Sequence, residues 1–137
     1  MEVGAQMKDN AAGEQWANEM QESSALIGSI LGVTHPELYK QGIEALTLLS
    51  REGGKYVDNP DQLVRALKVW TSPFSALSVI TNRNTPAHRD TKGRNEWLDF
   101  VVALGEDDSV GIMTFLGLGL SVGYNPGTII GIAGKVI

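Results

Sequence analysis

The chain has 137 residues, which is the size of one ordinary domain, and 42% of them are apolar, enough for a single core. It contains no cysteine, so disulfide frameworks, thiolate zinc sites and cysteine nucleophiles are excluded. The net charge of -5 argues against nonspecific coating of nucleic acid.

The charge is unevenly distributed along the chain. Residues 61–95 carry six basic and two acidic side chains, a net charge of +4, whereas the segments before and after them are acidic. A polyanionic partner would be attracted to this middle segment, although a solvated basic loop on an acidic domain gives the same pattern. There is no long apolar run and no secretory signal at the amino terminus, so we expect a soluble, intracellular protein that does not enter the membrane.

Helices are expected in the first half of the chain, after a disordered tail formed by residues 1–13. Apolar residues recur there at helical spacing, and proline and glycine mark the ends. Thr34 is the expected cap of the second helix, and Asp58-Asn59-Pro60 offers a cap and a first-turn proline for the third. The three helices are expected from about Glu14 to Leu31, from Pro36 to about Gly53, and from Pro60 to about Trp70.

The second half of the chain has the pattern of strands and turns. Short runs rich in β-branched and aromatic residues are separated by glycine, aspartate and an Asn-Pro-Gly turn. The expected fold class is α+β, with amino-terminal helices followed by an antiparallel sheet or barrel. The expected strands are Phe74–Thr81, Trp97–Leu104, Val110–Phe115, Leu118–Val122 and Thr128–Ala133.

The final run, GIAGKVI, ends inside an apolar stretch with no polar tail. An unpaired apolar edge would be exposed there. From this pattern we expect a carboxy-terminally truncated piece of a larger barrel domain, with a complete small domain whose last strand is central as the alternative.

The segment HRDTKGRN, residues 88–95, fits two different kinds of site. It copies the H-R-D-x-K-x-x-N catalytic loop of protein kinases, but the glycine-rich loop, strand lysine and Asp-Phe-Gly site of a kinase are missing. His88 and Asp90, two apart on an extended segment, also match two thirds of a two-histidine, one-carboxylate iron site. The spacing alone does not separate a metal site from a solvated pair in a loop. The other histidine, His35, lies at a helix start, where capping or packing is the expected role.

A resemblance over most of the chain favours iron. The runs SVITNRNTPAHRDTKGRNEWLDFVVALG and LGLSVGYNPGTIIGIAGKVI, with HPELYKQGIEALTLL before them, resemble the TET/JBP-type oxygenase domains of mushroom-forming fungi, often found beside transposons. The similarity covers roughly residues 25–137. It implies a double-stranded β-helix, of the jelly-roll or cupin-like kind, that uses Fe(II) and 2-oxoglutarate to oxidise the methyl group of 5-methylcytosine in DNA. By this resemblance His88 and Asp90 are the first two iron ligands.

The chain also departs from this family. Its members continue into strands that supply a distal histidine and a basic residue for the 2-oxoglutarate carboxylate, and neither follows in the 137 residues. We therefore expect residues 14–137 to be the amino-terminal part of such a domain, with little activity alone. No catalytic residue beyond the metal ligands is assigned. The alternatives are a degenerate, non-catalytic β-helix that binds DNA or a partner protein, and a cupin-like metal protein with other chemistry.

Several further side chains have two interpretations each. Arg83 is a candidate for the 2-oxoglutarate carboxylate or a DNA phosphate, and a surface role is the alternative. The basic residues Arg89, Lys92 and Arg94 are candidates for contacts with DNA phosphates, with plain solvation as the alternative. For Trp97 the sequence favours a core position over a base-stacking role. A protein that modifies genomic DNA would be nuclear, and the sequence does not indicate an oligomeric state.

Overall fold

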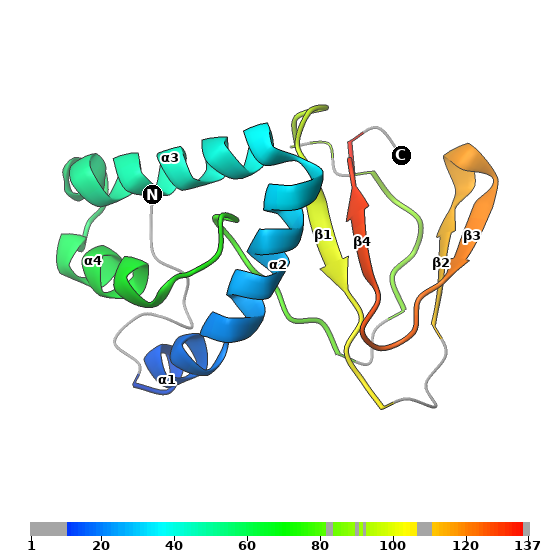
Figure 1. Cartoon of the computed structure of the whole chain (residues 1–137), viewed down its shortest axis with the longest axis horizontal. Helices are drawn as coiled ribbons and strands as arrows, with labels where there is room; N and C mark the ends of the chain where they lie inside the picture. The colour runs from blue at the N-terminus through cyan, green and yellow to red at the C-terminus, as the bar shows by residue number, and fades with distance from the viewer. Residues whose placement is uncertain (1–10, 82–83, 90, 92, 107–110, 136–137) are drawn as a thin grey trace. The chain divides into compact units, whose positions relative to one another are not determined.

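The computed structural model describes residues 11–81, 84–89, 91, 93–106 and 111–135 (Figure 1). The chain divides into two compact units, Met1–Val79 and Ile80–Ile137. Helices form the first unit and strands the second, so the expected α+β class is confirmed. In the described part of the chain, no helix is long and apolar enough to span a membrane.

The helical unit contains four α-helices and one short 3-10 helix. Their bounds are α1 (Ala11–Glu19), α2 (Gln21–Thr34), α3 (Pro36–Glu52), η2 (Gly53–Lys55) and α4 (Pro60–Val69). The first predicted helix is therefore two helices with a break at Met20. Residues 11–13, which we expected in a disordered tail, begin α1, while residues 1–10 lie outside the described part.

The two predicted caps had different outcomes. The side chain of Asn59 accepts a hydrogen bond from the backbone N–H of Gln62 at 3.3 Å, which confirms it as the cap of α4. The prediction for Thr34 was wrong, because its hydroxyl donates instead to the carbonyl of Ile30, one turn back, at 2.8 Å. His35 occupies the N-cap position of α3, but its side chain makes no capping hydrogen bond.

Pro73 packs closely against α2 and α3. A Cβ atom added at Gly28 of α2 would lie 2.6 Å from the Pro73 ring, and one added at Gly42 of α3 would lie 2.5 Å from the Pro73 carbonyl oxygen. Real Cβ atoms do not approach other atoms that closely. Glycine is therefore needed in the middle of both helices, where its low helix propensity would otherwise be a cost.

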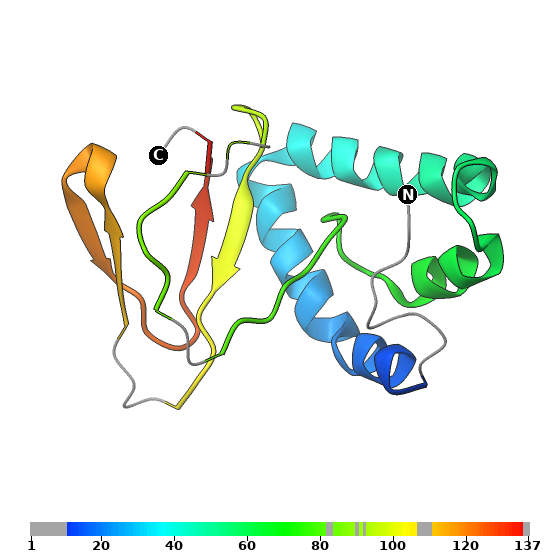
Figure 2. The ribbon, with the colours of Figure 1, turned by 180° about the vertical axis from the view of Figure 1, so that it is seen from behind.

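The strand unit contains two antiparallel pairs (Figure 2). Strand β1 (Asp99–Val102) pairs with β4 (Ile129–Ile132), and β2 (Ile112–Phe115) pairs with β3 (Leu120–Gly123) after the 3-10 turn η3 (Leu116–Leu118). Four of the five predicted strands are thereby confirmed, three of them in shortened form and the fourth, predicted at Leu118–Val122, shifted to Leu120–Gly123.

The prediction of a strand at Phe74–Thr81 was wrong. Between α4 and β1 the described residues contain neither helix nor strand, because no neighbouring segment offers them a ladder of backbone partners. The described strands form two separate two-stranded sheets, so a jelly-roll barrel stays a prediction.

The β2–β3 hairpin extends one residue pair beyond its strands. The backbone N–H of Tyr124 donates to the carbonyl of Gly111 at 2.8 Å. The Tyr124 hydroxyl is buried and has no hydrogen-bond partner among the described residues. Burial disfavours the charged phenolate and raises the pKa of Tyr124 above its ordinary value.

The first prediction concerns the glycine in the middle of α3. Replacing Gly42 with alanine should lower the free energy of unfolding by about 1 kcal/mol or more, because crowding against Pro73 outweighs the gain in helix propensity. Gly32→Ala in α2 is the control, since its added Cβ would meet only the Tyr39 ring at 3.6 Å, an ordinary contact. That variant should be more stable by about 0.5 to 1 kcal/mol in urea unfolding. A stabilised Gly42→Ala protein would contradict the close approach of Pro73.

The second prediction concerns the buried hydroxyl of Tyr124. Tyr124→Phe should raise the free energy of unfolding by about 1 kcal/mol, because it removes a buried polar atom that lacks a partner. Since the folded state has the higher pKa, the tyrosine protein should also lose stability as pH rises above about 10, and the Phe variant should lack this tyrosine's share of that loss. Tyr39→Phe, at an exposed tyrosine, serves as the control. Destabilisation by Tyr124→Phe would show that its hydroxyl is hydrogen-bonded after all.

Candidate functional site

The candidate iron ligands lie in an irregular, exposed segment that leads into β1. Pro86 and Gly93 lie in it, and none of the described residues from Asn84 to Leu98 belongs to a helix or strand. Irregular segments of this kind often carry functional side chains, and β1 holds the carboxy-terminal end of this one. His88 and Arg89 are both exposed.

A backbone contact fixes the tautomer of His88. Its Nδ1 lies 2.9 Å from the carbonyl oxygen of Pro86. A carbonyl oxygen only accepts hydrogen bonds, so Nδ1 carries the proton and donates it, and the lone pair of the neutral ring is on Nε2. Metal-bound histidines in proteins commonly have this arrangement, in which the second ring nitrogen is held by a carbonyl or carboxylate. The side chain of His88 therefore has the chemistry of a metal ligand at Nε2.

The other predicted site residues are only partly visible. Asp90, Arg83 and Lys92 lie outside the described residues, so their predicted roles stay predictions. Among the residues that the structure describes, no three histidine or carboxylate side chains gather into a group that would hold a metal. Of the two predicted iron ligands, His88 therefore lies among the described residues and Asp90 does not.

Arg94 and Trp97 form a contact that we did not expect from the sequence. The guanidinium carbon of Arg94 lies 5.3 Å from the centroid of the Trp97 ring, within the range of a cation–π interaction. Asn95 and Glu96 form the turn between them, and the backbone N–H of Trp97 donates to the Arg94 carbonyl at 3.2 Å. The side chain of Trp97 is 50% exposed, so the prediction of a core position was wrong.

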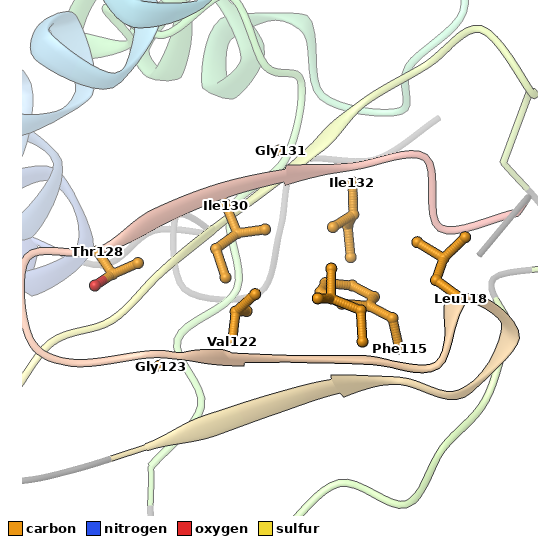
Figure 3. Close-up of a pocket in the computed structure, with 9 residues that line it drawn as sticks. Phe115, Leu118, Val122, Gly123, Thr128, Ile130, Gly131 and Ile132 are labelled. Carbon is orange, nitrogen blue, oxygen red and sulfur yellow. The ribbon is translucent and has the colours of Figure 1, made fainter.

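The strand unit also contains an apolar groove of about 340 Å³ between the β2–β3 hairpin and β4 (Figure 3). Val122 and Ile130 point toward one another across it, and Phe115 and Leu118 face Ile132. Among the described residues that line the groove, none has an ionisable side chain. Its lining residues are Phe115, Leu118, Leu120, Val122, Gly123, Thr128, Ile130, Gly131 and Ile132.

A comparison with protein families decides what kind of domain this is. The family described as the oxygenase domain of the 2OGFeDO superfamily, Tet_JBP, matches residues 2–137. The chain belongs to the TET/JBP oxygenase family. A search of curated proteins finds no match.

Membership of the TET/JBP family confirms the broad part of the sequence-based prediction. The superfamily consists of dioxygenases, which are oxidoreductases, and it uses Fe(II) and 2-oxoglutarate. The proposed fungal group, the substrate and the truncation are finer statements that the family match does not address. Sequence reasoning missed the Arg94–Trp97 contact, whose only signal was an arginine and a tryptophan three residues apart around a polar pair.

The third prediction tests the exposure of Trp97 in this TET/JBP domain. Trp97→Phe should reduce quenching of the tryptophan fluorescence by acrylamide, because Trp97 is half exposed while Trp16 and Trp70 are of intermediate exposure. Trp70 is the matched control, since its indole N–H donates to the Phe74 carbonyl at 2.7 Å. Trp70→Phe should leave the mean quenching constant unchanged or higher. Stronger quenching in the Trp97→Phe protein would mean that Trp97 is buried.

Proposed function

We propose that this TET/JBP domain takes part in the oxidation of 5-methylcytosine in DNA, with His88 and Asp90 as iron ligands. The observation that carries the proposal is the tautomer of His88, whose Nε2 lone pair is suited to a metal, in a chain that belongs to this family. When bound, Fe(II) with 2-oxoglutarate and oxygen supplies the oxidant for the methyl group.

The protein's own residues would hold and position the reactants. His88 would bind iron through Nε2 while Pro86 holds the opposite side of its ring, and the Asp90 carboxylate would bind beside it. Arg83 would bind a carboxylate of 2-oxoglutarate, as arginine commonly does through paired hydrogen bonds. Arg89, Lys92 and Arg94 would contact DNA phosphates, which fixes the position of the strand without reading its sequence. A protein with this substrate would work in the nucleus.

The third iron ligand is the open part of the proposal. We propose that the second histidine of the iron site is the distal histidine that the resemblance implies, which these 137 residues do not contain. Two ligands alone hold Fe(II) weakly, and we expect the 137-residue chain by itself to have little activity. The rival function is that of a non-catalytic domain that binds DNA or a partner protein.

The fourth prediction is the dependence of oxidation on His88. DNA containing 5-methylcytosine is incubated with protein, Fe(II) and 2-oxoglutarate, and oxidised cytosine and succinate are measured by mass spectrometry. The assay uses the 137-residue chain and, where the gene encodes residues beyond Ile137, the longer protein. His88→Ala should lower turnover by more than about 100-fold, since loss of a residue that only supports a ligand already costs about 10- to 100-fold.

His35→Ala is the matched control. It should leave the turnover of the longer protein unchanged, and a loss equal to that of His88→Ala would mean that the loss is not specific to the proposed ligand. Turnover that survives His88→Ala would rule out the ligand assignment. Absence of turnover in every form, with DNA binding intact, would establish the non-catalytic alternative.

A further inference from the structure

Trp97 has an unusual position for a tryptophan. Its ring is half exposed, and it stands two residues before β1, whose backbone is held by the ladder with β4. A large aromatic ring that remains in water gives up much of the free energy that burial would supply. Tryptophan is enriched among the residues that contribute most to binding, where a ligand covers the flat ring.

Arg94 prepares this ring for a planar partner. Its guanidinium lies over the Trp97 ring, and the turn at Asn95 and Glu96 sets the spacing of the two side chains. Because both come from one turn, less side-chain freedom remains to be lost when a ligand binds. Arginine planes and tryptophan rings are the two side-chain surfaces on which unpaired nucleobases commonly stack.

The surrounding charge favours a nucleic acid over an apolar or cationic ligand. Arg89 and Arg94 are exposed in the segment of the chain that carries a net charge of +4 between residues 61 and 95. Glu96 lies in the same turn, and its negatively charged carboxylate would repel a phosphate. A ligand that combines a flat ring with a nearby phosphate matches Trp97 and Arg94 together.

We propose that Trp97, with Arg94 against its ring, is a stacking site for an unpaired base of DNA. The base packs on the indole, and the edge of the Arg94 guanidinium donates to a phosphate of the same strand. The choice of DNA rests on the function proposed above, but binding at this site requires neither iron nor 2-oxoglutarate.

The test measures binding to short single strands by quenching of tryptophan fluorescence. Two DNA probes of equal length are compared, one with ordinary bases and one in which the central bases are replaced by abasic sites, so that only the bases differ. Trp97→Ala should weaken binding of the complete strand by about fivefold to a hundredfold, which is the usual loss when a stacking ring is removed. It should leave binding of the abasic strand unchanged. Trp97→Phe keeps a ring and should lose less affinity than Trp97→Ala, while showing no further quenching from this position.

Arg94 is tested through the salt dependence. Arg94→Gln should reduce the slope of log affinity against log salt by about 0.7, which is the share of one phosphate contact on a single strand. Glu96→Gln is the matched variant in the same turn, and it should strengthen binding of both probes. Circular dichroism of each variant confirms that the strands remain folded.

Equal affinity of the complete and abasic strands for the unmodified protein would overturn the proposal, as would unchanged affinity in Trp97→Ala. A different result would contradict the proposed function, namely oxidation of 5-methylcytosine that persists in the His88→Ala variant. Base-dependent binding without oxidation would support the stacking site and leave the domain a DNA-binding one. Oxidation without base-dependent binding would support the proposed enzymatic function and contradict the stacking site.

Discussion

The antiparallel pairing of β1 with β4 is the interaction on which the strand unit depends. It joins residues 99–102 to residues 129–132, and the hydrogen bond from the Ala103 N–H to the Thr128 carbonyl, at 2.9 Å, continues it beyond the strands. Gly131 allows the Phe100 ring to lie across the ladder, because an added Cβ would come within 2.9 Å of that ring. The ladder thereby fixes both the end of the turn that carries Trp97 and one wall of the apolar groove.

The same pairing explains which faces are covered. Along β1, Phe100 and Val102 share one face, while Asp99 and Val101 share the other with Ile130 and Ile132, which line the groove. A two-stranded sheet buries little apolar surface by itself. Large apolar side chains of the strand unit therefore remain exposed, such as Ile112 at 73% and Leu118 at 62%. Such exposure is typical of a sheet surface that packs against further structure. The groove has no polar centre, so its chemistry is that of a hydrophobic core and differs from that of the His88 segment.

The sequence predicted those features that depend on local chemistry. Asn59 before a proline favours a helix start at that position, and the β-branched runs that became β1 and β4 have an intrinsic preference for strands. Prediction from the sequence failed where the structure of a segment depends on a partner elsewhere in the chain. Phe74–Thr81 has strand-like residues but gains no ladder, and Thr34 finds a nearer acceptor in the Ile30 carbonyl. Alternation placed Trp97 on the same face as Asp99, but only the pairing of the strands decides whether that face is covered.

The two chemical features of the HRDTKGRN region depend on different parts of the backbone, and this separation bears on function. His88 is oriented by a carbonyl two residues before it, within the irregular segment, whereas Arg94 and Trp97 are set by a turn that ends at a paired strand. A site that oxidises a base must hold a metal and also accept a base that has left its stack, and unstacking costs a few kcal/mol. An exposed indole near the proposed iron ligands in sequence would offset part of that cost before any chemistry occurs. If both proposals hold, substrate capture and metal binding should be separable by mutation, since the contacts described for Trp97 and His88 involve different backbone groups.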